Sequence, residues 1–124
     1  MINQKYYSDI KNFPKQFVEG LELAKDLKVN KEFNRVVVCG MGGSSLYTEI
    51  INDFLAREKE FKIKLEANRG YDLPLNCDEN TLIIVASHSG NTEETLSCLE
   101  AVKERELQHC IFCSGGKLLE KSGS

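Results

Sequence analysis

Four stretches of the chain carry apolar residues in the pattern of β-strands. Three are short, continuous apolar runs, at 36–39, 82–86 and 110–113, and the first two are expected to be buried strands, as in a parallel sheet. In the fourth, 61–68, apolar and polar residues alternate, which is typical of a strand with one solvated face at or near a sheet edge. The pattern therefore predicts four strands.

Between these strands, apolar residues recur every three or four positions, as on one face of a helix. This spacing predicts helices over 13–27, 46–55 and 92–106, and the start of a further helix at 118–121. In the first of these, Pro14 suits the opening turn, and Phe17 and Leu21 are core candidates. One side of the second carries Leu46, Ile50, Ile51, Phe54 and Leu55. The polar residues 1–12 are expected to form a poorly ordered or loosely docked lead-in.

Strands that alternate with helices indicate an α/β fold in which helices cover both faces of a parallel sheet. A chain of 124 residues can form one domain with a hydrophobic core, and it is too short for two. We therefore expect a single domain over 13–124.

Composition narrows the class of partner. The net charge of −3 argues against a nucleic-acid-binding protein, which normally has a basic face. No apolar run is long enough to span a bilayer and no signal segment opens the chain, so we expect no membrane contact and a cytoplasmic location. Five cysteines fit a reducing compartment. Cys110 and Cys113 have C-x-x-C spacing, but strand residues three apart point to opposite faces, so no redox or zinc pair is expected.

The segment that follows the strand at 82–86 carries the most distinctive chemistry. Its sequence is Ser-His-Ser-Gly-Asn-Thr-Glu-Glu-Thr, residues 87–95, and it runs directly into a helix. The unpaired N–H groups and positive dipole end of a helix start attract anions. Hydroxyl groups of Ser87, Ser89 and Thr92 could donate further hydrogen bonds, and Gly90 allows a sharp turn or a close approach. We therefore predict a phosphate site here.

Helix capping is the alternative explanation of the same residues. Asn91 followed by Glu94 has the spacing of a capping box. One capping residue accounts for one of these positions, and it leaves three hydroxyl groups in one loop unexplained.

Two further glycine- and serine-rich loops follow predicted strands, at 40–45 and 114–117. Ligands of parallel α/β sheets bind at the carboxyl ends of the strands, so the loops at 40–45 and 87–92 are expected to form one site. The glycines at 40 and 42 also suggest a dinucleotide fingerprint, with Glu66 on a ribose or Arg69 on a 2′-phosphate. That fingerprint is incomplete, because Ser45 stands where glycine or alanine is required.

Together these segments resemble sugar isomerase (SIS) domains. The resemblance rests on Gly-Met-Gly-Gly-Ser at 40–44, Tyr-Asp-Leu-Pro at 71–74, the segment 87–97 and Ser-Gly-Gly-Lys-Leu at 114–118. It is closest to the amino-terminal domain of bifunctional phosphoglucose/phosphomannose isomerases. It implies a flavodoxin-like three-layer sandwich with a five-stranded sheet, of which four strands are recognised here.

The resemblance also implies a ligand and its site. The phosphate of a sugar phosphate such as fructose 6-phosphate would be bound by Gly42, Gly43, Ser44, Ser87, Ser89 and Thr92. The loop residues His88, Gly90 and Asn91 would form a wall of the site. Such isomerases interconvert aldose and ketose through an enediol, and the resemblance implies neither a cofactor nor a metal.

This sequence departs from the family's pattern in two respects, and both limit which functional residues the resemblance can assign. The family's base glutamate and catalytic histidine and lysine lie beyond Ser124, as does its fifth strand, so the domain is expected to be truncated and no catalytic residue is assigned. A second SIS domain or a second copy of the chain is expected as partner. His88 stands where relatives carry tyrosine or glutamine. An isomerase component, a sugar-phosphate sensor without catalysis and a nucleotide-binding domain all stay open.

Overall fold

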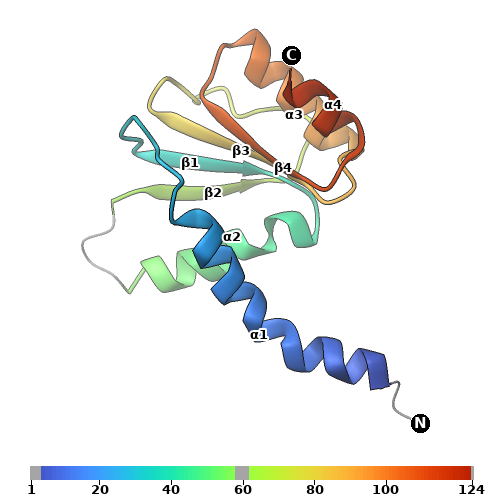
Figure 1. Ribbon diagram of the computed structural model, residues 1–124. Helices are drawn as coiled ribbons and strands as arrows, with labels where there is room; N and C mark the ends of the chain where they lie inside the picture. The colour runs from blue at the N-terminus through green and yellow to red at the C-terminus, as the bar shows by residue number, and fades with distance from the viewer. Residues whose placement is uncertain (1–3, 58–61, 124) are drawn as a thin grey trace. The chain divides into compact units, whose positions relative to one another are not determined.

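The computed structural model describes residues 4–57 and 62–123 (Figure 1). They form two compact units, Met1–Lys31 and Glu32–Ser124. The first unit contains helix α1 (Gln4–Ala24). The second contains β1 (Arg35–Cys39), α2 (Gly43–Leu55), β2 (Lys64–Asn68), β3 (Thr81–Ser87), α3 (Glu93–Glu104), β4 (His109–Cys113) and α4 (Gly116–Ser122).

The four strands of the second unit form one parallel sheet in the order β2-β1-β3-β4. Helix α2 covers one face of this sheet, and α3 and α4 cover the other (Figure 1). The predicted α/β fold with helices on both faces is confirmed. The apolar runs of β1 and β3 lie at its centre, and β2, with its alternating pattern, lies at an edge, as predicted.

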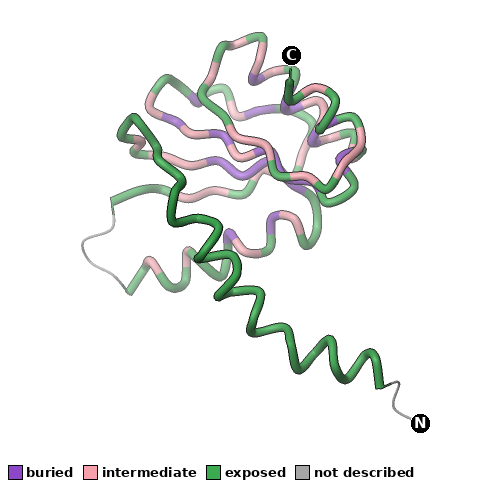
Figure 2. The backbone as a smooth tube through the Cα atoms, viewed as in Figure 1, coloured by how far each residue is buried: buried purple, intermediate pink, exposed green. Residues whose placement is uncertain are grey.

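Strand alternation places the core on the face covered by α3 and α4. Val37 and Ile83 are paired in the sheet and fully buried there, as is Leu99 of α3. Figure 2 shows this burial along the central strands and on the helix surfaces that face them. The same alternation turns Ile84 and Phe112 toward the other face, where α2 packs mainly along β2.

The helix predicted to open at Pro14 begins earlier, so that prediction is wrong. Helix α1 starts at Gln4 and contains Pro14 in its interior. A proline there removes one backbone hydrogen bond, to the carbonyl four residues earlier, and neighbouring turns can tolerate that loss. Residues 4–12 of the expected lead-in are therefore helical, and residues 1–3 lie outside the described part.

The prediction that Phe17 and Leu21 belong to a core is also wrong for the unit that contains them. Their exposed fractions are 68% and 71%, and no described residue of α1 is buried (Figure 2). The reason is that α1 is the only regular element among residues 4–31, so this described part of the unit offers no second apolar surface.

Helix α2 presents mainly polar residues to the sheet. Ser45 and Thr48 are buried, whereas Leu46, Ile50 and Phe54 are exposed. Of the apolar side that the sequence pattern identified, only Leu55 is half-buried, and the rest is exposed in this unit. The predicted strand 61–68 is observed over Lys64–Asn68, and Phe61 lies outside the described residues.

Candidate functional site

The loops after β1, β3 and β4 lie at one edge of the sheet, where parallel strands all end. The chain moves from β1 outward to β2, and from β3 outward to β4 in the opposite direction. This reversal leaves a crevice outside the ends of β1 and β3, which is the usual ligand position in such sheets. The predicted phosphate loops, 40–45 and 87–92, follow these two strands.

The three hydroxyl groups predicted to bind phosphate lie together at the end of β3. Ser87 Oγ lies 2.8 Å from Thr92 Oγ1 and 3.4 Å from Ser89 Oγ. Backbone N–H groups fix two of them: Gly90 N–H donates to Ser87 Oγ at 3.1 Å and Asn91 N–H donates to Ser89 Oγ at 3.2 Å. We call Ser87, Ser89 and Thr92 the hydroxyl cluster.

The capping-box interpretation of this loop is wrong. The residue at the N-cap of α3 is Thr92, and the described structure shows no side-chain hydrogen bond that caps the helix. Asn91 contacts a different element: its Oδ1 accepts the Lys117 N–H at the start of α4, at 3.1 Å. The hydroxyl cluster is therefore not explained by capping.

Two carboxylates stand in the first turn of α3 beside the cluster, Glu93 and Glu94. Both compete with an incoming anion for the positive end of the helix. The Tyr71 O–H donates to Glu93 Oε2 at 3.2 Å and so ties this carboxylate to the loop after β2. Glu94 first, and then the hydrogen bond to Glu93, raise the pKa of Tyr71, which keeps its hydroxyl protonated.

Close backbone contacts hold the loop after β3 against the loop after β4. Gly90 has φ of +67°, and an added Cβ would lie 1.8 Å from the Gly115 carbonyl oxygen, so only glycine fits. The Ser114 N–H donates to the His88 carbonyl at 3.1 Å, and the Leu118 N–H donates to the Gly90 carbonyl at 3.0 Å. The position of the hydroxyl cluster thus depends on the loop 114–118.

The loop after β1 approaches the end of β3 at Gly40. A Cβ at Gly40 would lie 2.9 Å from the Ser44 carbonyl oxygen and 3.0 Å from that of Ala86. The loop ends at Gly42, which has φ of +54°, and α2 begins at Gly43. Gly43 and Ser44 therefore place a second helix N-terminus at the same crevice.

Glu66 and Arg69, which the sequence suggested as ligands of a dinucleotide, instead form contacts within the fold. Glu66 pairs with Val37 inside the sheet and bonds Arg35 Nη2 at 2.7 Å. Arg69 Nε donates to the buried Ser45 Oγ at 2.9 Å, and its Nη2 bonds Glu49. Neither arrangement favours the dinucleotide hypothesis.

A cavity of about 500 Å³ opens on the α2 face of the sheet, next to the ends of β3 and β4. The predicted site residues Ser44, Ser87 and His88 line it. His88 Nδ1 lies 3.0 Å from Ser114 Oγ, which belongs to the neighbouring loop. The rest of the lining is Tyr47, Ile84, Ala86, Phe112 and Cys113. Ser89 and Thr92 lie outside this lining, so the cavity and the hydroxyl cluster meet at Ser87.

Among the hydroxyl-bearing residues of this cavity, sequence reasoning missed Ser114 and Tyr47. Ser114 could have been found, because its loop was already placed at the same edge as the loop 87–92. Tyr47 gave no signal beyond its place in a helix. Burial raises the pKa of Tyr47, so its phenol is a neutral hydrogen-bonding group at the cavity wall.

The cysteines of the described structure are free thiols. A hydrogen bond with Cys98 and burial raise the pKa of Cys39, so this last residue of β1 carries a neutral thiol.

In the described residues no group of three or more His, Cys, Asp or Glu side chains is arranged to hold a metal ion. None of the described helices is long and apolar enough to cross a membrane.

No protein-family model matches the chain. A bifunctional phosphoglucose/phosphomannose isomerase from Caldicellulosiruptor bescii is 35% identical over 117 residues, 92% of this chain and 34% of the relative. The protein of the same name from Aquifex aeolicus is 34% identical over 119 residues, 96% of this chain and 36% of the relative. The chain is homologous to one part of these isomerases. The resemblance predicted from the sequence is confirmed, and the chain spans about a third of the length of these relatives.

Two other comparisons extend this group. A D-glucosamine-6-phosphate 4-epimerase from Sulfolobus acidocaldarius is 32% identical over 107 residues, 86% of this chain and 33% of the relative. The fold matches a solved structure from Bacillus subtilis, described as a candidate phosphosugar isomerase, with a TM-score of 0.60. That match covers 81% of this chain and 32% of the other at 22% identity, so it supports the fold alone.

Proposed function

We propose that this chain is the sugar-phosphate-binding part of an aldose–ketose isomerase, of the kind that interconverts glucose 6-phosphate or mannose 6-phosphate and fructose 6-phosphate. The observation that carries the proposal is the hydroxyl cluster at the start of α3 and at the crevice between β1 and β3. The isomerase relatives and the epimerase relative, all with phosphosugars in their names, favour a sugar phosphate over other anions.

The cluster is suited to a phosphate group. Ser89 Oγ already accepts the Asn91 N–H, so its own O–H can donate to a phosphate oxygen. The first backbone N–H groups of α3 have no partner within the helix and lie beside these hydroxyl groups. Gly43 and Ser44 at the start of α2 would complete the site from the other side, as predicted from the sequence.

In this function the chain binds the sugar phosphate, and residues outside the chain carry out the proton transfer of the isomerisation. In the isomerases that it resembles, a glutamate moves the proton between C1 and C2, and no residue of this chain is assigned that role. We propose that a second domain or a second copy of the chain supplies it, and that the protein works in the cytoplasm on free sugar phosphates.

Calorimetric titration with fructose 6-phosphate tests the proposal on wild type, Ser89→Ala and Ser97→Ala. Loss of one hydrogen bond to a charged phosphate weakens binding by about 10–100-fold, equivalent to ~1.5–3 kcal/mol. We expect this loss in Ser89→Ala. Ser97 lies in α3 outside the hydroxyl cluster, so Ser97→Ala should bind as wild type does.

Equal affinity of Ser89→Ala and wild type would show that the hydroxyl cluster does not hold the phosphate. An isomerisation assay on the same samples separates two versions of the proposal. Binding with turnover of fructose 6-phosphate would mean that the chain also supplies a base, whereas binding without turnover fits a domain or sensor that needs a partner.

A further inference from the structure

His88 and Ser114 form a hydrogen-bonded pair beside the hydroxyl cluster, on the other face of the sheet. Strand alternation turns His88 toward the face that carries α2, whereas the buried Ser87 turns toward α3. The pair is held by two hydrogen bonds: Ser114 Oγ to His88 Nδ1 at 3.0 Å, and Ser114 N–H to the His88 carbonyl at 3.1 Å. The loops after β3 and β4 therefore fix the imidazole ring in place.

The second ring nitrogen of His88, Nε2, makes no hydrogen bond to the residues that the structure describes. His88 and Ser114 are both exposed, and both line the cavity of about 500 Å³. Because one ring nitrogen bonds Ser114 and the other is available, His88 can bond a ligand in the cavity without losing its support.

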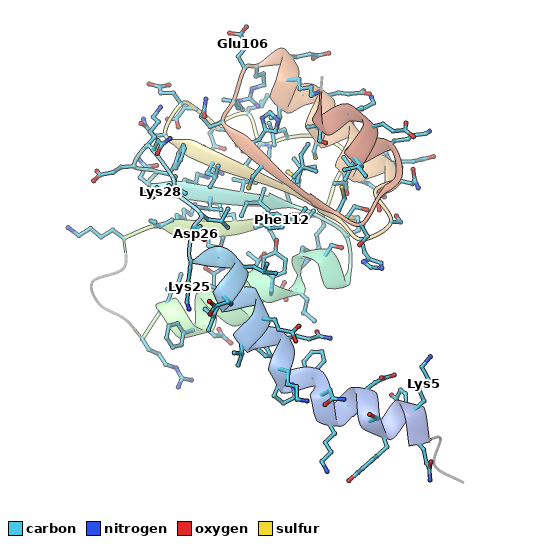
Figure 3. All side chains as sticks on the ribbon, in the orientation of Figure 1. Lys5, Lys25, Asp26, Lys28, Glu106 and Phe112 are labelled. Carbon is cyan, nitrogen blue, oxygen red and sulfur yellow. The ribbon has the colours of Figure 1, made fainter. Side chains whose placement is uncertain are left out.

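Part of the lining of this cavity is apolar. Ile84 and Phe112 contribute to it, and Figure 3 shows Phe112 on the α2 side of the sheet. The volume lies within the range of about 300–1,000 Å³ that small-molecule sites occupy. A sugar has hydroxyl groups along its edge and C–H groups on its faces, so it fits a space with one polar rim and one apolar wall.

We propose that this cavity binds the sugar part of the ligand and that His88, positioned by Ser114, forms hydrogen bonds with the sugar's hydroxyl groups. The inference rests on the proposed function, because Ser87 is the residue at which the cavity meets the phosphate-binding cluster. The ligand class is then a phosphorylated polyhydroxy compound rather than any phosphate ester. His88 determines specificity, and the hydroxyl cluster provides the anion affinity.

The test compares two probes, fructose 6-phosphate and inorganic phosphate, on each variant by calorimetric titration. His88→Leu removes both ring nitrogens, and loss of a neutral hydrogen bond costs roughly 3–10-fold in affinity. We expect His88→Leu to weaken fructose 6-phosphate by that factor and to leave inorganic phosphate unchanged. His88→Gln keeps a donor and an acceptor and should restore most of the loss.

Ser114→Ala leaves the imidazole present and removes its support, so it should give a smaller loss for fructose 6-phosphate alone. Thermal melts of all variants check folding, and the exposed positions of both side chains make correct folding the expected result. If His88→Leu weakens both probes equally or weakens neither, the inference is overturned while the proposed function stands on Ser89→Ala. If wild type binds neither probe, both fail.

Discussion

Glu66, in the edge strand β2, forms ion pairs with two cationic side chains. Its carboxylate bonds Arg35 Nη2 at 2.7 Å and Lys64 Nζ at 2.5 Å. The side chains of Arg35 and Glu66 are only 11% and 27% exposed, so water weakens their attraction less than it does at the surface. The hydrogen bond from Arg35, followed by that from Lys64, lowers the pKa of Glu66 below its ordinary value of 4.5.

We therefore predict that Glu66→Gln lowers the free energy of unfolding at pH 7 by about 1 kcal/mol. A carboxylate with a lowered pKa in the folded state contributes stability above its ordinary value, and this contribution disappears as pH falls through the folded-state value. The difference between wild type and variant should therefore shrink below about pH 4.5. Urea denaturation at pH 7 and at stepwise lower pH measures it.

The control for this prediction is the exposed carboxylate of Glu120, which takes part in no ion pair given by the described structure. Glu120→Gln should leave the free energy of unfolding unchanged at every pH. A constant difference between wild type and Glu66→Gln down to pH 3 would mean that the Arg35 ion pair does not contribute to stability.

At the scale of elements, the two loops beside the site stabilise each other through Gly90. We predict that Gly90→Ala lowers the free energy of unfolding by about 2–4 kcal/mol, because φ is +67° and the added Cβ meets the Gly115 carbonyl at 1.8 Å. Gly70→Ala is the matched control, since nothing lies within 4 Å of a Cβ there. Urea denaturation compares them, and equal stability of the two variants would contradict the contact between the loops.

The sheet could be predicted from sequence because its strands carry the patterns that burial requires. Residues 82–86 are apolar throughout and lie in the centre, whereas 61–68 alternates and its described part lies at an edge. The start of α1 could not be predicted in this way. Pro14 suggested a first turn, but a helix can contain a proline if it gives up one hydrogen bond.

The part of the candidate site that lies within a single loop could be predicted from the sequence. Ser87, Ser89 and Thr92 belong to one loop, so their types and spacing already suggested a cluster. The pair of His88 and Ser114 joins residues 26 positions apart, and it depends on the register of β3 and β4. No local pattern carries that register, so the sequence places Ser114 at the same edge of the sheet, and only the structure shows its hydrogen bond to His88.

At the scale of the whole molecule, the unit Glu32–Ser124 exposes a set of large apolar side chains on the α2 side. In α2, Leu46 is 52% exposed, Ile50 is 64% exposed and Phe54 is 63% exposed. Within the described sheet, β2 and β4 are also edge strands with unpaired backbone groups. Helix residues four apart are neighbours, so these side chains form an exposed apolar stripe, which is typical of a contact with another protein surface; the open edges add to it.

We predict that the chain self-associates through this side of α2, with a dissociation constant on the order of 10 µM, at the weak end of the range from µM to pM that protein interfaces span. Sedimentation velocity over a concentration series should show monomers converting to dimers. The double substitution Ile50→Glu with Phe54→Glu places two charges on the apolar side and should shift the chain to monomer. Glu104→Ala in α3, on the opposite face of the sheet, should leave the equilibrium unchanged. A wild type that is monomeric at all concentrations would contradict self-association through α2.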